Sequence, residues 1–505
     1  MPIERRLFLG GGLAAAAIWR PFGAARAAEF RTDPFTLGVA SGCPRPNSVV
    51  IWTRLTFEDA APPADPFAPL ATAEHPPLDV EWIVASDESF RQPVRSGLFR
   101  ATGDFGHSVH VEVEGLEPER WYFYRFRCGN AESPIGRTRT APQKSVRQFR
   151  FAFASCQQYE HGYYAAYRDM SGRDLDLVVH LGDYIYERSW GTDHVRKHNA
   201  GVPSLLFEYR NRYALYKSDP DLQKAHASFP WLMVWDDHEV TNNYSGDTAP
   251  DVPDPAEFRR RRRAAYQAWF EHMPVPPKIG AAFDSHRIYD HYRFGDLLGI
   301  TLLDARQYRS PELTGKADDD RPERTILGGE QEEWLITTLK GVPAKWSVLA
   351  QQTLLSERDV KPGADVEYNL DGWDGYREAR RRLLDAIEAS DLANPLIIGG
   401  DLHAFFAADV KRNFSDHAAK PMATEFVGGS MTSDGPPEAS LATALAENPH
   451  LKFASGNHGY AMMNLSERAA QVDFVAVADR KTQDSRSSIF QSFAVVDGLP
   501  GVNRL

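Results

Sequence analysis

An apolar run, Trp231-Leu232-Met233-Val234-Trp235, leads directly into four ionisable residues, Asp236-Asp237-His238-Glu239. The run has the length and composition of a buried strand. A buried carboxylate raises the free energy of the folded protein unless something compensates its charge. Four ionisable side chains in a row at a strand end are therefore difficult to accommodate without a cation. This stretch predicts a metal site at the carboxyl end of a buried strand.

The same order, an apolar strand followed by polar residues, recurs along residues 146–505. Further buried strands are predicted at 149–154, 175–181, 298–303, 346–350 and 396–398, with helices at 255–272 and 375–390. In layered α/β folds the carboxyl ends of neighbouring strands open onto one crevice, where sites assemble. We therefore predict an α/β fold in which the polar residues after these strands meet.

Residues 30–145 follow a different pattern. Short β-type runs at 49–52, 80–84, 108–113 and 121–127 alternate with turn residues. This pattern is typical of an immunoglobulin- or fibronectin-like sandwich. The predicted organisation is a β-sandwich domain at 30–145, followed by an α/β domain at 146–505.

Residues 1–28 have the features of an export signal. Arg5-Arg6 precedes an apolar stretch at 7–19, and Ala25 and Ala27 offer a cleavage site. The paired arginines resemble a twin-arginine signal, which predicts transport by the twin-arginine export machinery to the periplasm or the medium. Beyond residue 28 no apolar run reaches the roughly 18 residues of a membrane span.

The charge of the chain disfavours nucleic-acid binding. The 505 residues include 57 basic and 69 acidic ones, a net charge of −12. Residues 1–28 contain four Arg and one Glu, so the remainder carries a charge of −15. An acidic surface repels phosphate backbones. Phosphate chemistry on such a protein needs concentrated local positive charge, which metal ions supply most simply.

Several side chains after the predicted strands are metal ligands by type. Asp183 follows the strand at 175–181, and Tyr186 lies three residues on. A phenolate prefers a hard trivalent ion, so this pair favours ferric iron over zinc. Asp401 and His403 are two residues apart and face the same way from an extended segment. The alternatives are a helix N-cap for Asp183 and core packing for Tyr186.

The chain has three cysteines, Cys43, Cys128 and Cys156. Cys156 lies at a strand end beside the predicted site, where it is either a thiolate ligand or a small buried hydrophobe. We favour the ligand. Cys43 and Cys128 both fall in the β-sandwich domain, and we predict that they form a disulfide.

Four motifs in this order resemble the PhoD-type alkaline phosphatases. The motifs are Phe151-Ala152-Phe153-Ala154-Ser155-Cys156, Gly182-Asp183-Tyr184-Ile185-Tyr186-Glu187, Trp235-Asp236-Asp237-His238-Glu239 and Gly400-Asp401-Leu402-His403. That family belongs to the calcineurin-like metallophosphoesterases and is related to the purple acid phosphatases. The resemblance covers nearly the whole chain. One departure is Cys43, where the family usually has Asp.

The resemblance implies a four-layer α/β/β/α core that holds one Fe³⁺ and two Ca²⁺ ions. It implies that Cys156, Asp183 and Tyr186 contact the iron, and that Asp183 also reaches a second metal. Asp237 corresponds to a ligand of the second metal, and whether Asp236 or Asp237 binds a given ion stays open. Asp401 and His403 match the last ligand motif. Asn242 and Asn243 offer carbonyl oxygens to calcium.

The resemblance also implies the reaction. It predicts an exported phosphatase that hydrolyses phosphate esters with a metal-activated oxygen nucleophile. His238 corresponds to the histidine that acts on the transition state. Arg306 is a candidate for binding the substrate phosphate, with an ion pair to Asp304 or to the acidic site as the alternative. Two other functions remain open: a phosphodiesterase of phospholipase D type, and a non-catalytic secreted calcium-binding protein.

Overall fold

The computed structural model of the chain describes residues 29–57, 75–281, 283–284, 286–313, 321–341 and 344–505. The predicted export signal at 1–28 lies outside the described residues. In the described part of the chain, no helix combines the length and apolar character needed to span a bilayer.

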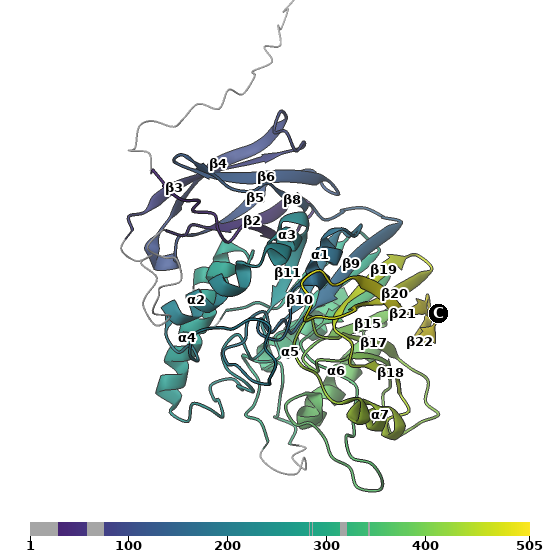
Figure 1. Cartoon of the computed structure of the whole chain (residues 1–505). Helices are drawn as coiled ribbons and strands as arrows, with labels where there is room; N and C mark the ends of the chain where they lie inside the picture. The colour runs from purple at the N-terminus through teal and green to yellow at the C-terminus, as the bar shows by residue number, and fades with distance from the viewer. Residues whose placement is uncertain (1–28, 58–74, 282, 285, 314–320, 342–343) are drawn as a thin grey trace, which may run out of the picture.

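Two large sheets form the centre of the molecule (Figure 1). The first has ten strands in the order β22 (Leu499–Arg504), β21 (Ser487–Val496), β20 (Ala469–Val477), β19 (Gly459–Ser466), β9 (Gln148–Ala154), β10 (Leu177–Leu181), β11 (Pro230–Val234), β1 (Val39–Gly42), β2 (Ser48–Arg54) and β5 (Ser108–Glu114). Within it, β9, β10 and β11 are parallel neighbours.

The second sheet has seven strands in the order β12 (Asp290–Phe294), β13 (Leu298–Leu302), β14 (Trp346–Ala350), β15 (Pro395–Gly399), β17 (Ala423–Gly428), β16 (Phe405–Val410) and β18 (Leu451–Ser455). Its strands β13, β14, β15 and β17 are parallel. The strands predicted from sequence in residues 146–505 are all present in these two sheets, with ends that differ by at most two residues.

Helices cover the outer faces of both sheets. The helices are α1 (Ala165–Ser171), α2 (Leu206–Lys217), α3 (Pro220–Ser228), α4 (Pro255–His272), α5 (Gly329–Gly341), α6 (Arg377–Ala389) and α7 (Glu438–Glu447), with short 3₁₀ turns η3 (Gly103–Phe105), η4 (Pro277–Ala281) and η5 (Trp373–Tyr376). Residues of α1 to α4 pack with the ten-stranded sheet, and residues of α5 and α6 pack with the seven-stranded sheet.

Alternation along β15 shows how the inner sheet faces meet. Leu396 and Ile398 belong to the core shared by both sheets, while Ile397 belongs to the core under α5 and α6. A strand buried on both faces reads as a continuous apolar run, and this is the pattern in the sequence. The predicted four-layer α/β/β/α core is confirmed.

The N-terminal strands form a sandwich with one shared sheet. Strands β3 (Leu78–Ala85), β4 (Pro93–Ala101), β6 (Trp121–Cys128), β7 (Ala131–Glu132) and β8 (Gly136–Arg139) make a separate five-stranded sheet. It packs against β2 and β5 through Ile51, Val84 and Phe126. The second face of this sandwich continues into the ten-stranded sheet, because β1 pairs in parallel with β11 (Ser41↔Pro230).

The predicted disulfide between Cys43 and Cys128 is wrong. Both residues are buried free thiols. Cys43 follows β1 and packs in the core between the two large sheets, whereas Cys128 ends β6 and packs inside the sandwich. Each cysteine therefore faces a different core. Burial raises the pKa of both thiols to about 12.

Candidate metal centre

The candidate ligands follow the strands at a constant spacing. Cys156, Asp183, Asp236 and Asp401 each lie two residues after the end of β9, β10, β11 and β15, respectively. The first three strands belong to the ten-stranded sheet and β15 belongs to the seven-stranded sheet. The site therefore forms where the carboxyl ends of both sheets meet.

Two glycines allow the ligand loops to touch. A Cβ atom on Gly182, which has φ +104°, would lie 2.4 Å from Cβ of Asp236. A Cβ atom on Gly400 would lie 2.4 Å from Oγ of Ser155, across the two sheets. Any larger residue at either position would push the loops apart, so these glycines set the close packing of the ligand loops.

Five of the predicted ligands adopt left-handed backbone conformations. The φ angles are +59° for Cys156, +56° for Asp183, +55° for Asn243, +61° for Asp401 and +51° for His403. Such a conformation costs a non-glycine residue roughly 1–3 kcal/mol and persists only where the surroundings enforce it. Their concentration around one point indicates a functional site.

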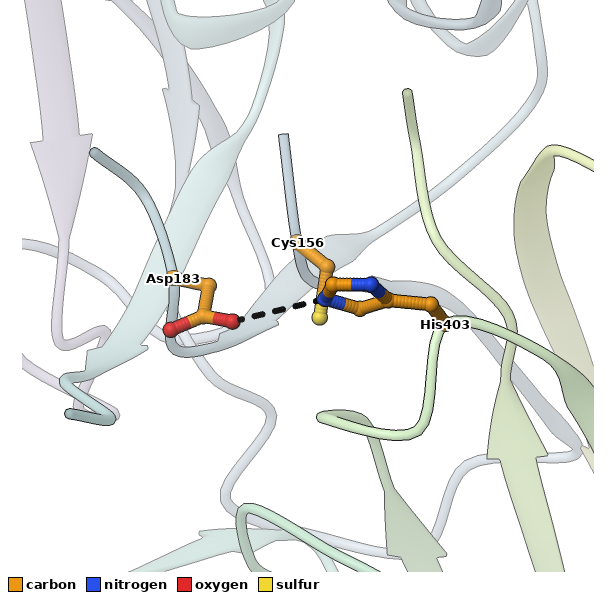
Figure 2. Close-up of side chains that lie close together, drawn as sticks. All are labelled: Cys156, Asp183 and His403. Atoms are coloured by element: carbon orange, nitrogen blue, oxygen red, sulfur yellow. Dashed lines mark ion pairs between the residues drawn. The ribbon is translucent and has the colours of Figure 1, made fainter. Parts of the chain in front are cut away.

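The first group of ligand atoms joins Cys156, Asp183 and His403, whose donor atoms lie within 4.8 Å of one another (Figure 2). His403 Nε2 lies 3.9 Å from Asp183 Oδ2. The other ring nitrogen, Nδ1, donates to the backbone oxygen of Asp434 at 2.6 Å. That bond leaves the lone pair of Nε2 directed at the group, as in metal-binding histidines.

Tyr186 lies against the same group. Its hydroxyl donates to Asp183 Oδ2 at 2.8 Å, lies 3.0 Å from His403 Nε2 and accepts a hydrogen bond from Ser433 at 2.8 Å. Burial raises the pKa of the Tyr186 phenol and of the Cys156 thiol well above their ordinary values. Both become anionic ligands only if a cation offsets that cost.

Two further groups of donor atoms continue from the first. One combines Asp183, Asp237 and His238, and the other combines Asp236, Asp237 and Asp401. Burial, together with the neighbouring carboxylates, raises the pKa of Asp236 and of Asp237, and that of Asp401 to about 6.

Three carboxylate oxygens in these groups are buried and have no hydrogen-bond partner among the described residues: Asp183 Oδ1, Asp236 Oδ2 and Asp237 Oδ1. An unpartnered buried carboxylate oxygen is costly, and a bound cation is the usual compensation. The donor set also suits both softer and harder ions, because it combines a thiol, a phenol, an imidazole and several carboxylates. The side chains therefore fit a multinuclear metal cluster.

Arg306 lies within the acidic site. Its Nη1 and Nη2 atoms donate to the two oxygens of Asp371, each at 2.8 Å, and its Nε donates to Asp236. Nη2 also lies 3.7 Å from Oδ1 of both Asp237 and Asp401. The guanidinium thus makes the ion pair with the acidic site, which is one of the contacts predicted for it.

His238 pairs with Glu187. Its Nδ1 donates to Glu187 Oε2 at 2.6 Å, which leaves Nε2 available to the site. Although burial opposes both charges, the mutual attraction lowers the pKa of Glu187 to about 2 and raises that of His238. Glu187 therefore favours a protonated His238.

Asn243 contacts the site through its backbone. Its N–H donates to Asp237 Oδ2 at 2.6 Å. Its side-chain oxygen accepts a hydrogen bond from Asn242 at 2.9 Å. The N–H of Asn242 donates to Glu187 Oε1 at 3.0 Å. The two asparagines thus border the carboxylates from the loop that follows β11.

Comparison with known proteins identifies the family. The sequence profile of the PhoD-like phosphatases matches residues 151–474, and the profile of their N-terminal domain matches residues 22–142. The chain belongs to the PhoD-like phosphatase family. Alkaline phosphatase D of Bacillus subtilis (strain 168) is 41% identical over 498 residues, covering 93% of this chain and 84% of that protein. A solved structure, "Structure of PhoD", shares 40% identity at a TM-score of 0.90, covering 95% of this chain and 93% of that one.

Family membership makes this protein a hydrolase of phosphate esters. The resemblance stated from the four motifs is confirmed. The acidic cluster described above is accordingly the candidate active site of a PhoD-like phosphatase.

The sequence assigned no individual role to two residues that support this site, Glu239 and Asp371. Glu239 accepts hydrogen bonds from the backbone N–H groups of Asp183, Tyr184 and Asp236, at 3.1, 2.6 and 2.8 Å. Its place directly after His238 was a usable signal. No sequence signal pointed to Asp371, because it lies in a loop far from every strand-end motif.

Proposed function

We propose that this PhoD-like phosphatase is an exported, metal-dependent enzyme that hydrolyses phosphate monoesters. The observation that carries the proposal is the set of buried carboxylate oxygens on Asp183, Asp236 and Asp237 that have no hydrogen-bond partner among the described residues, beside the Cys156 thiol and the His403 imidazole. Carboxylates buried this close together destabilise the folded protein unless bound cations compensate their charge, so the cluster is best explained as a metal site.

The donor types support Fe³⁺ and Ca²⁺ as the ions. Cys156, Asp183, Tyr186 and His403 would hold the iron, because thiolate and phenolate are its preferred anionic ligands here. Oxygen ligands for calcium would come from the remaining members of the site: Asp236, Asp237, Asn243 and Asp401. When bound, such ions neutralise the phosphoryl oxygens and provide a nucleophilic oxygen at neutral pH.

The side chains have distinct roles in this proposal. His238 donates a proton to the departing ester oxygen, and Glu187 holds the ring in the orientation that allows it. Asp237 would hold metal ions together with Asp183, in the donor group that also includes His238. Arg306 is assigned to organising the carboxylates, since its donors point at Asp236 and Asp371.

The main competing function is a phosphodiesterase of phospholipase D type on the same fold. The experiment is turnover of p-nitrophenyl phosphate against bis-p-nitrophenyl phosphate, each with EDTA and with added Fe³⁺ and Ca²⁺. We expect the monoester to have the higher kcat/KM and EDTA to abolish its turnover. A higher kcat/KM for the diester would favour the phosphodiesterase, and no turnover of either ester at full metal occupancy would favour a calcium-binding protein.

Export through the twin-arginine machinery is proposed on the residues at 1–28 alone. The test is fractionation of cells that express the full chain or an Arg5→Lys, Arg6→Lys variant. We expect the wild type in the periplasm or medium and the variant in the cytoplasm. Equal export of both proteins would exclude this pathway.

A further inference from the structure

Trp190 stands beside three side chains of the candidate active site. Its indole ring is nearly parallel to the imidazoles of His238 and His403, at 13° and 14°, with ring centres 5.5 and 6.4 Å away. It also contacts Tyr186, with ring centres 4.7 Å apart. No role of this tryptophan follows from the ligand motifs.

The exposure of these side chains shows which side of the site is open. Tyr186 and His238 are buried, while the partly exposed residues of the site are Trp190, Asn242, Asn243, Asp401 and His403. A substrate therefore approaches past the partly exposed set. Trp190 offers the large apolar surface in that set, and the other members are polar or ionisable.

The backbone of Trp190 is held rigidly by two histidines. Its carbonyl oxygen lies 2.9 Å from Nε2 of His161 and 2.6 Å from Nε2 of His194. A carbonyl only accepts hydrogen bonds, so both nitrogens donate. His161 is set in this tautomer because its Nδ1 accepts the N–H of Asp434 at 3.0 Å.

Asp434 links this anchor to the ligand loop. Its backbone oxygen accepts the hydrogen bond from His403 Nδ1, and its N–H binds His161. The backbone of Trp190 is thus connected through the His161 side chain to Asp434, whose carbonyl orients His403. A rigid aromatic side chain contributes more to binding than a mobile one, since little conformational entropy is lost on contact.

We propose that Trp190 forms the wall against which the leaving group of the substrate lies, and that it favours phosphate monoesters of flat aromatic alcohols over those of flexible aliphatic alcohols. The inference rests on the proposed function, in which His238 faces the departing oxygen. A group attached to that oxygen lies near His238 and therefore near the indole. Stacking of an aromatic ring on an aromatic side chain changes affinity about 3- to 10-fold.

The test uses two inhibitors that the enzyme does not hydrolyse, phenylphosphonate and methylphosphonate. They share the phosphonate group and differ in the flat ring, so reactivity of the leaving group does not enter. Inhibition constants are measured against p-nitrophenyl phosphate for the wild type, Trp190→Ala and Trp190→Phe, together with the metal content of each protein. Trp334→Ala is the matched control, because Trp334 is a partly buried tryptophan on α5 at the outer face.

We expect Trp190→Ala to raise the inhibition constant of phenylphosphonate about 3- to 10-fold and to change that of methylphosphonate less than about twofold. Trp190→Phe should restore most of the affinity, and Trp334→Ala should change neither constant. Equal rises for both inhibitors, or loss of metal in Trp190→Ala, would overturn the inference, as would unchanged constants. These failures are distinct from failure of the proposed function, in which the wild type itself would not turn over the monoester.

Discussion

Glu239 Oε2 accepts the backbone N–H of Asp183 at 3.1 Å, which ties the loop after β10 to the loop after β11. The same oxygen accepts the N–H of Asp236, and Oε1 accepts that of Tyr184. One carboxylate therefore fixes the backbone of two adjacent ligand loops. Residues that orient metal ligands typically contribute about 10- to 100-fold to metal affinity.

Glu239→Gln should weaken metal binding by about 10- to 100-fold. Both oxygens of Glu239 accept backbone N–H groups, and in the variant the amide NH₂ would replace one of these acceptors and face an N–H donor. Metal retained after dialysis against graded chelator measures the effect. The matched control is Glu425→Gln. Glu425 is a buried carboxylate that accepts N–H groups of Leu355 and Ser356 at 2.6 and 2.9 Å. Equal metal loss in both variants would contradict a specific role for Glu239.

Glu187→Gln should lower kcat by about tenfold or more with little change in KM, because a neutral partner holds His238 less firmly in its protonated form. Steady-state kinetics with p-nitrophenyl phosphate give both constants. The double variant with His238→Gln should lose no more activity than His238→Gln alone, since the two residues act as a unit. Additive losses would show that Glu187 acts independently of His238.

Removal of the metal ions should abolish turnover and lower the thermal unfolding midpoint together, because the carboxylates then repel one another without compensation. At a free metal concentration of about 1,000 times Kd, binding contributes about 4 kcal/mol of stability. Differential scanning calorimetry with and without EDTA measures it. Asp237→Asn and Asp401→Asn should lose turnover far more than stability. Full activity after long incubation in chelator would refute metal dependence.

Tyr186→Phe should stay folded, lose most of its phosphatase activity, and shift or weaken a visible absorption band of the iron-loaded protein. The substitution removes the hydroxyl that contacts Asp183 and His403 and keeps the ring. Since Cys156 would also contribute to the band, the comparison must be made between variant and wild type. If the variant and the wild type had identical spectra, Tyr186 would be a core-packing residue and not an iron ligand. A colourless wild type that binds only zinc would exclude iron.

Lys217 should make the free energy of unfolding increase as the pH rises from about 7 to 10. Burial lowers the pKa of its ammonium from 10.5 to about 7, and the side chain lies over the ring of Trp52 at 4.3 Å. His226 lies nearby and is itself held neutral by burial and by this charge. Between about pH 7 and 10 the unfolded chain binds the proton that the folded chain has released. Raising the pH therefore favours the folded state.

The comparison is with Lys217→Met, which cannot titrate. Relative to this variant, the wild type should gain stability as pH rises from 7 to 10, by at most about 1.4 kcal/mol per pH unit. Thermal unfolding midpoints of both proteins across this range provide the measurement. Parallel pH curves for the two proteins would show that Lys217 keeps an ordinary pKa.

The sequence by itself determined the strand-end ligand pattern. The runs before Asp236 and Asp401 are continuously apolar, and those before Cys156 and Asp183 are interrupted only by Arg150 and His180. Apolar runs of this kind are what strands buried on both faces require. Because parallel strands deliver their next residues to one edge, the meeting of these ligands could be predicted without coordinates. The four-layer core followed from the resemblance that these motifs carry.

Only the tertiary structure decided how distant segments meet. The pairing of β1 with β11 joins residues near 41 to residues near 230, and it continues the sandwich into the large sheet. The partners of Arg306 and the separate cores around Cys43 and Cys128 depend on packing in the same way. Local periodicity encodes which residues form a strand and which face is buried. Many distant segments are chemically equivalent partners, and the packing of the whole chain decides which of them pair. A local sequence pattern does not encode that choice.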